Sequence, residues 1–323
     1  MRQLVTGGAG FIGSNYVRHV LASSDDEVTI YDALTYAGNL STLRDLDEDP
    51  RVRFVKGDIC DLGTLRDAMA GHDVVLHFAA ETHVDRSIGG SHDFVQTNCV
   101  GTNLVMEAAR LVGVRKVVHI GTDEVYGSVA VGSSKESDPL DPRSPYSASK
   151  AGSDLIALSH HATHGLPVVV TRCTNNFGPF QFPEKLIPLF ATNLLDGDTV
   201  PLYGDGLNER DWLYVGDHCA CLTIVLQRGR PGETYNIGAG NETANRVLTD
   251  KLLALTGRDE SAVRYVADRL GHDRRYSLDI AKVTALGWQR RRSLDEALEE
   301  TVRWYRDNRW WWEPLKRPSR ADV

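Results

Sequence analysis

The stretch TGGAGFIG, residues 6–13, decides the fold that this sequence encodes. It follows a short apolar run, QLVT, and it opens an amphipathic segment over residues 11–22. The glycines Gly7, Gly10 and Gly13 therefore lie between a predicted strand and a predicted helix, with a spacing one residue longer than GxGxxG. In that context one glycine makes the turn, one lets the backbone approach a pyrophosphate, and one packs the helix on the strand. The stretch predicts a dinucleotide-binding turn at a helix N-terminus.

A carboxylate at the end of the next strand refines this prediction. Asp32 ends the run EVTIYD, 19 residues after Gly13. A carboxylate at this place can accept hydrogen bonds from ribose hydroxyls and would repel a 2′-phosphate. The sequence therefore favours NAD over NADP.

Outward from this turn, short β-branched runs alternate with longer amphipathic stretches. The runs are QLVT, EVTIYD, VRFVKGDI, DVVLHFA, KVVHIGT and PVVVTRC, and helical patterns cover residues 11–22, 62–70, 91–112 and 144–164. Such alternation predicts an α/β fold with a doubly wound parallel sheet of the Rossmann type, covered by helices on both faces. After residue 175 the pattern loosens into polar, turn-rich segments. We expect a Rossmann domain over 1–175, a smaller substrate lobe over 176–316 with some segments returning to the first domain, and a disordered tail at 317–323.

Composition excludes several classes of partner. The 323 residues carry a formal net charge of −8 and a pI near 5.8, which argues against binding to nucleic acid or to a membrane surface. The start of the chain has no apolar signal segment, and no stretch approaches the roughly 18 apolar residues of a membrane span. Five scattered cysteines show no spacing typical of zinc. We expect a cytoplasmic protein with a small-molecule ligand, reduced cysteines and no metal.

A second motif points to redox chemistry. SPYSASK places Tyr146 four residues before Lys150, on one face of a predicted helix. Tyrosine is a poor base at neutral pH, but a nearby ammonium and a positively charged nicotinamide ring favour its phenolate. Such a tyrosine can take a proton from a sugar hydroxyl as hydride leaves for NAD. Alone, YxxxK is usually an ordinary surface pair; behind a glycine turn and several βαβ units, the catalytic interpretation is favoured.

A third motif, GTDEVYG, puts Thr122, Asp123 and Glu124 directly behind the buried run KVVHI. Two neighbouring carboxylates in a loop are usually solvated turn residues. In this position they could instead serve as an acid and a base, because adjacency pushes their pKa values apart.

These residues together resemble the extended short-chain dehydrogenase/reductase superfamily. The segments DALTYAGN, HFAAETHVDRSI, GTDEVYG, NNFGPFQFPEKLIPL, YGDGLNERDWLYV and DRLGHDRRYSLD closely resemble one family in it, dTDP-glucose 4,6-dehydratase. The likeness runs from residue 1 to about residue 316. It implies conversion of dTDP-glucose to dTDP-4-keto-6-deoxyglucose and water, with tightly bound NAD regenerated in each turnover.

The resemblance also assigns catalytic roles. Tyr146, beside Lys150, takes the 4-hydroxyl proton during C4 oxidation, and Thr122 hydrogen-bonds the same oxygen. Glu124 then removes the C5 proton, and Asp123 protonates the departing C6 hydroxyl. Elimination needs the C4 ketone first, because only an adjacent carbonyl makes the C5 hydrogen acidic.

Binding residues follow from the same resemblance. Expected contacts with NAD come from Gly7, Gly10, Phe11, Ile12, Gly13, Asp32, Leu34, Thr35, Ala37, Gly38, Asp58, Ile59, Phe78, Ala79, Ala80, Thr82, Thr97, Tyr146, Lys150, Cys173 and Asn175. Expected contacts with the nucleotide sugar come from Thr82, Thr122, Asn176, Glu184, Lys185, Leu186, Pro201, Tyr203, Arg210, Asn245, Arg269, His272 and Tyr276. Thr82 departs from the family pattern, where serine is commoner, but keeps the hydroxyl.

The sequence also bears on the oligomeric state and on two alternative functions. The segments at about 98–112 and 147–163 carry wide apolar and small-residue surfaces, and in the family these helices pair across a two-fold axis, so we expect a homodimer. A nucleotide-sugar 4-epimerase would share the fold, NAD and the Tyr/Lys pair but would not need the two carboxylates. A catalytically silent NAD-binding regulator would have lost the active residues, which are present here.

Overall fold

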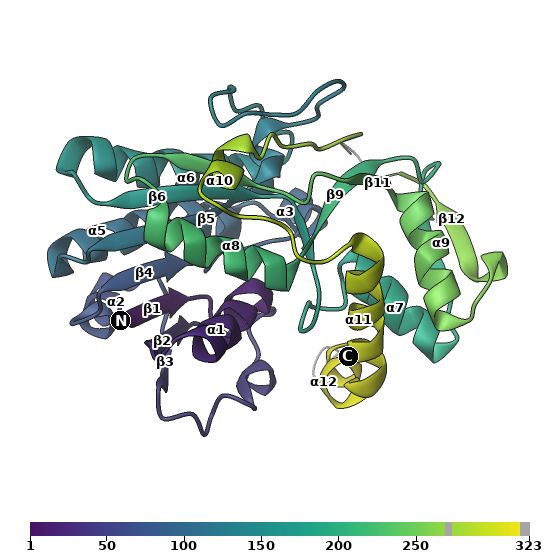
Figure 1. Cartoon of the computed structure of the whole chain (residues 1–323), viewed down its shortest axis with the longest axis horizontal. Coiled ribbons are helices and arrows are strands. Elements are labelled where there is room, and N and C mark those ends of the chain that lie inside the picture. Colours follow the sequence, from purple (N-terminus) through teal and green to yellow (C-terminus); the bar gives the residue numbers. More distant parts are fainter. Residues whose placement is uncertain (269–272, 317–323) are drawn as a thin grey trace.

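A seven-stranded parallel sheet forms the centre of the computed structural model, which describes residues 1–268 and 273–316 (Figure 1). The strand order is β10-β6-β5-β4-β1-β2-β3, which contains the Rossmann order 3-2-1-4-5-6. The strands are β1 (Arg2–Thr6), β2 (Glu27–Asp32), β3 (Val52–Lys56), β4 (Val74–His77), β5 (Lys116–Thr122), β6 (Val168–Cys173) and β10 (Thr234–Ile237). In register, Val5 pairs with Ile30 and Val118 with Val169. The predicted fold class is confirmed.

Helices cover both faces of this sheet. One face carries α1 (Phe11–Ser23) and α8 (Val215–Arg228), and the other carries α2 (Leu62–Met69), α5 (Thr102–Val112) and α6 (Pro145–His164). The central strands are buried on both faces, which explains their nearly continuous Val, Ile and Leu runs. Short elements between them are η1 (Leu40–Leu43), α3 (Val84–Gly89), α4 (His92–Val95), η2 (Gln96–Gly101) and η3 (Asp123–Tyr126).

A second body of helices lies beside the carboxyl ends of the strands (Figure 1). Its elements are β7 (Asn175–Phe177), α7 (Leu186–Asp196), β8 (Val200–Tyr203), β9 (Glu209–Tyr214), β11 (Glu242–Ala244), α9 (Asn245–Thr256), η4 (Glu260–Ala262), β12 (Val263–Val266), α11 (Leu294–Asp307) and α12 (Arg309–Lys316). Helix α10 (Ala281–Ala285) instead packs against β10 in the first body. Helices α7, α9, α11 and α12 share an apolar core with the buried Trp311 and Trp312. The Trp311 indole donates a hydrogen bond to Thr42 Oγ1 (3.1 Å), which fastens α12 to the first body.

Elements from beyond residue 175 also complete the large sheet. Strand β10 pairs with β6, and α8 packs against α1, so the chain returns to the first body after leaving it. The domain boundary at residue 175 stays a prediction. The expected tail at 317–323 lies outside the described residues. Among the described residues, no helix is long and apolar enough to cross a membrane.

The single helix predicted over residues 91–112 is interrupted. A π-type turn, η2, separates α4 from α5. The backbone is not regularly α-helical here, because residues of this turn make contacts beside the cavity. Asn98 in this turn accepts a hydrogen bond from Glu81 N (2.8 Å) and donates one to Ser149 Oγ (2.8 Å). The turn also brings Thr97 to the cavity described below.

Candidate active site

A cavity opens at the carboxyl ends of the parallel strands, where ligands bind in open α/β sheets. It receives residues from the turn after β1, from the end of β2 and from the ends of β4, β5 and β6. Of the residues predicted to contact NAD, it is lined by Gly7, Gly10, Phe11, Ile12, Gly13, Asp32, Thr35, Ala37, Gly38, Asp58, Ile59, Phe78, Ala79, Ala80, Thr82, Thr97, Tyr146, Lys150, Cys173 and Asn175. Leu34 is not part of the lining: its side chain packs on the apolar core, and its N–H donates to Asp32 Oδ1 (2.8 Å).

The glycine turn has the close packing that a dinucleotide cradle requires. Gly7 has a φ of +70°, and a Cβ there would lie 2.6 Å from Ala79 N. A Cβ on Gly13 would lie 2.4 Å from Gly7 O, so helix and turn could not approach each other with any larger residue. Helix α1 begins at Phe11 without a side-chain cap from the described residues, which leaves its first N–H groups for an anion.

Asp32 stands at the adjoining edge of the cavity. Its carboxylate accepts hydrogen bonds from Ala9 N (2.9 Å) and Leu34 N (2.8 Å), which fix its orientation. Burial raises the pKa of Asp32, and these two backbone bonds oppose the rise. Each oxygen keeps acceptor capacity for a ribose hydroxyl. The turn and this acid fit NAD, which these residues would hold by its pyrophosphate and its adenosine ribose.

Tyr146 and Lys150 lie on the first turns of α6. This helix starts with a capping box between Ser144 and Ser147 and with a proline at its first position. Lys150 is buried, and its Nζ donates to Ile120 O (2.7 Å). Burial lowers the pKa of Lys150, while the Asp154 carboxylate opposes that shift.

The pKa of Tyr146 differs from the expectation. Burial and then the Glu124 carboxylate raise it, while a hydrogen bond with Thr82 opposes the rise. A phenol in this apolar, acid-lined place keeps its proton until more positive charge arrives. The lowering predicted from the sequence therefore depends on the positive nicotinamide ring as well as on Lys150.

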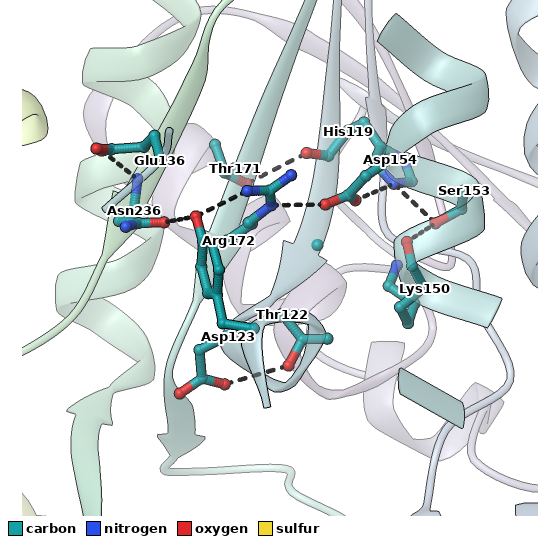
Figure 2. Close-up of polar contacts among 12 residues, drawn as sticks. His119, Thr122, Asp123, Glu136, Lys150, Ser153, Asp154, Thr171, Arg172 and Asn236 are labelled. Carbon is teal, nitrogen blue, oxygen red and sulfur yellow. Dashed lines mark hydrogen bonds and ion pairs between the residues drawn. The ribbon is translucent and has the colours of Figure 1, made fainter. Parts of the chain in front are cut away.

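The acidic pair sits where β5 ends. Thr122 Oγ1 donates to Asp123 Oδ1 (3.3 Å; Figure 2). It also accepts from Glu124 N (3.3 Å), so one hydroxyl orders both neighbours. Asp123 is only 3% exposed, and its Oδ2 has no hydrogen-bond partner among the described residues. Burial, followed by the Glu124 carboxylate, raises the pKa of Asp123 to about 7. A side chain that holds a proton near neutral pH can act as a general acid.

This shift predicts a pH-dependent stability change in Asp123→Asn. Because burial raises the folded pKa from 3.8 to about 7, stability falls as the pH rises between these values. Asparagine removes the cost of the buried anion. At about pH 8.5 the variant should gain on the order of a few kcal/mol in unfolding free energy, and at about pH 4.5 the gain should shrink to about 1 kcal/mol. Urea unfolding at both pH values, with matched NAD content, measures this.

The exposed Asp67→Asn serves as the control and should leave stability almost unchanged at either pH. An equal effect of Asp123→Asn at both pH values would contradict the buried-acid interpretation.

The predicted nucleotide-sugar residues divide into two groups. Thr82, Thr122, Asn176, Glu184 and Lys185 line the cavity. Outside its lining lie Leu186 at the start of α7, Pro201 and Tyr203 in β8, Arg210 in β9, Asn245 at the start of α9, and Tyr276. Two others, Arg269 and His272, lie outside the described residues.

Arg210 and Tyr276 nevertheless interact electrostatically with the acidic pair. The Arg210 guanidinium carbon lies 4.3 Å from the centre of the Tyr276 ring, and its Nη2 donates to Asp273 O (2.8 Å). Arg210 opposes the rise in the Asp123 pKa, and the Glu124 carboxylate contributes to a raised Tyr276 pKa. Arg210 and Tyr276 therefore interact with the charges of Asp123 and Glu124, although neither of the two lines the cavity.

The cavity also contains residues that the sequence interpretation missed. Glu81, Gln181 and Phe182 belong to its lining. Tyr36, close by, places its hydroxyl 3.1 Å from Glu184 Oε1 and 3.2 Å from Thr82 O. All four stand within sequence segments that carry the family resemblance, so the segments, rather than any spacing of residue types, were the available signal.

The fold and the site define the class: an NAD-dependent short-chain dehydrogenase/reductase. Within that class, the chain belongs to the family of dTDP-glucose 4,6-dehydratases, as the comparisons with known proteins show. A model of the GDP-mannose 4,6 dehydratase family matches residues 4–301. The dTDP-glucose 4,6-dehydratase of Streptomyces niveus is 54% identical over 327 residues, covering 99% of this chain and 97% of the relative.

Solved structures give the same result. DesIV, the dTDP-glucose 4,6-dehydratase of Streptomyces venezuelae with NAD and TYD bound, matches with a TM-score of 0.96 at 57% identity, over 98% of this chain and 100% of that chain. The UDP-glucose 4-epimerase of Thermus thermophilus with NAD has a TM-score of 0.88 at 31% identity, over 95% of this chain and 100% of that one. Because the fold is shared with epimerases, the site residues must separate the two activities.

Proposed function

We propose that this chain converts dTDP-glucose to dTDP-4-keto-6-deoxyglucose and water in deoxysugar biosynthesis. The observation that carries the proposal is the acidic pair Asp123 and Glu124, which lines the same cavity as Tyr146, with Asp123 buried and its pKa raised to about 7. An epimerase inverts C4 and has no use for an acid and a base over C5 and C6. This pair therefore favours the dehydratase.

The reaction divides among the residues as follows. When bound, NAD supplies the hydride acceptor for C4 and the hydride donor for C6. Tyr146 takes the proton of the 4-hydroxyl, with Lys150 favouring its phenolate and Thr122 binding the same oxygen. Glu124 removes the C5 proton, which the C4 ketone makes acidic. Asp123 gives its proton to the leaving C6 hydroxyl, so that water departs. As hydride returns to C6, a proton returns to C5, so that the product regains its C5 hydrogen and no net reductant is consumed.

The nucleotide would be held by the lobe over 176–316. Guanidinium and amide donors bind a diphosphate well, and Arg210, Asn176 and Asn245 are the proposed donors. Arg269 and His272 remain proposed contacts by family resemblance.

We also infer a homodimer and a cytoplasmic location. Helices α5 and α6 pack side by side, and Leu111 and Leu155 on them are more than half exposed, while Val95 in the preceding α4 is 50% exposed. Such apolar side chains on neighbouring helices support pairing with a second copy. Size-exclusion chromatography with light scattering tests the dimer.

A direct assay tests the proposed function. The purified protein is incubated with dTDP-glucose without added reductant, and the sugar nucleotide is followed by mass spectrometry. We expect loss of one water and no net change in reduced-nicotinamide absorbance. An unchanged mass with inverted C4 would make the chain an epimerase, and no turnover with bound NAD would favour the silent NAD-binding protein.

A further inference from the structure

A buried ion pair crosses the protein interior directly beneath the proposed catalytic groups. Asp154 on α6 is fully buried, Arg172 on β6 is 4% exposed, and Arg172 Nε donates to Asp154 Oδ2 (2.8 Å; Figure 2). Neither residue lines the cavity. Burying two charges costs several kcal/mol per ion before their attraction is counted, so a buried pair is weak evidence for stability alone. Its place in the fold suggests a different use.

On one side the pair reaches the helix that carries Tyr146 and Lys150. Asp154 lies one turn after Lys150, and His119 Nε2 lies 3.2 Å from Asp154 Oδ1 and 3.1 Å from Ser153 Oγ. Ser153 in turn donates to Lys150 O (2.8 Å). Gly121 on β5 makes this approach possible, because a Cβ there would lie 2.8 Å from Asp154 Oδ1.

On the other side the pair reaches the turn that carries the acid and the base. Arg172 Nη1 donates to the Tyr126 hydroxyl (2.7 Å), which donates to Asn236 Oδ1 (2.9 Å). Tyr126 is the last residue of η3 (Asp123–Tyr126). The buried pair therefore connects α6 to η3, two elements whose active residues are adjacent in space but separated by more than twenty positions in sequence.

We propose that Asp154 and Arg172 are positioning residues that hold the oxidising pair, Tyr146 and Lys150, in register with the eliminating pair, Asp123 and Glu124, and that Asp154 also balances the buried Lys150 charge. The inference rests on the proposed function. Neither residue touches substrate or NAD; both act through the elements that do.

The charges around Lys150 predict the direction in which its pKa moves when Asp154 loses its charge. The titratable or charged groups that face this region come from α6, β6, β5, β4 and η2: Asp154, Tyr146, Arg172, Cys173, His119, His77 and Cys99. Burial lowers the pKa of His119, although its hydrogen bond with Asp154 opposes that shift, and burial also lowers the pKa of His77, so both imidazoles are neutral at pH 7. Asp154 is then the anion that offsets the two buried cations, Lys150 and Arg172. Without it, Lys150 should lose its proton at lower pH.

The first variant is Asp154→Asn, which keeps the shape and removes the charge. Its readout is the pH profile of C4 oxidation with dTDP-6-deoxyglucose, which has no 6-hydroxyl to eliminate, followed by reduced-nicotinamide absorbance. We expect the alkaline limb to move to lower pH by at least about one unit. The control is Asp217→Asn, another buried aspartate, which accepts a backbone N–H from Arg292 and lies outside the cavity. Its limb should stay with that of the wild type.

The second variant, Tyr126→Phe, cuts the link between Arg172 and η3 and keeps the ring. We expect exchange of the C5 hydrogen with solvent deuterium, measured on the same substrate, to slow about tenfold or more, while C4 oxidation stays within about twofold. The matched control is Tyr16→Phe, a buried tyrosine bonded to Gln3 Oε1 (3.0 Å) on the far side of the sheet. It should change neither rate.

The outcomes separate the two proposals. If the wild type forms no dehydrated product from dTDP-glucose, the proposed function fails. If the wild type is active but Asp154→Asn keeps its alkaline limb and Tyr126→Phe slows both steps equally, the positioning inference alone is wrong. Should Asp154→Asn not fold, Tyr126→Phe decides: selective loss of exchange supports the inference, and unchanged or equally slowed steps overturn it.

Discussion

Glu124→Gln should nearly abolish dehydration while leaving C4 oxidation in place. Glutamine has the size of glutamate but cannot accept the C5 proton, and removing a general base costs roughly 10² to 10⁴ in rate. The variant should still oxidise C4 reversibly, because Tyr146 and Lys150 lie on a different element, α6. The distinguishing measurement is exchange of the C5 hydrogen in deuterated solvent. The rate of this exchange should fall by the same factor as the rate of dehydration.

Glu300→Gln provides the control for this experiment. Glu300 is a partly buried glutamate on α11 that accepts hydrogen bonds from the Tyr214 hydroxyl and from Arg292, outside the cavity. The Glu300→Gln variant should exchange the C5 hydrogen of the substrate at the wild-type rate. Normal exchange in Glu124→Gln would remove Glu124 from the role of base and leave Asp123 or Tyr146 to supply it.

The parts of the fold that could be predicted from the sequence are those with local, periodic causes. The buried runs of β1, β2, β5 and β6 and the amphipathic stretches of α1 and α6 each follow from the spacing of their own residues. The glycine turn could be predicted largely for the same reason, because Gly10 and Gly13 approach Gly7 O within one strand-turn-helix unit, although Gly7 itself packs against Ala79 after β4. The π-type turn at 96–101 could not, since its cause is a set of contacts with Glu81 and Ser149 on other elements.

The site divides along the same line. The residues that carry the chemistry stand in contiguous motifs. In contrast, the hydrogen-bond network around the buried pair Asp154 and Arg172 joins positions 126, 154, 172 and 236, which come from η3, α6, β6 and β10. No spacing rule links such positions. The pKa of Tyr146 is a further example, because the motif displays the neighbouring lysine but hides the burial and the Glu124 carboxylate that raise this pKa.

Tyr146→Phe should stop the reaction one step earlier than Glu124→Gln does. Phenylalanine keeps the ring and its edge contact with Phe94 (6.3 Å between centroids) but cannot take the 4-hydroxyl proton. We expect C4 oxidation of dTDP-glucose to fall by roughly 10² to 10⁴, with no reduced-nicotinamide absorbance and no dehydrated product. The amount of NAD that copurifies should stay close to the wild-type amount. The control is Tyr235→Phe, a buried tyrosine of β10 whose hydroxyl accepts a bond from Arg230 N (3.1 Å).

The same variant tests the order of the steps. Only a C4 ketone makes the C5 hydrogen acidic, so Tyr146→Phe should lose C5 exchange together with oxidation, although Glu124 is intact. Glu124→Gln should lose exchange alone. If Tyr146→Phe exchanged the C5 hydrogen at the wild-type rate, the proton would be leaving without a ketone beside it, and oxidation could not be the step that prepares elimination. Loss of both steps in one variant and of exchange alone in the other would fix the sequence of proton transfers at these two side chains.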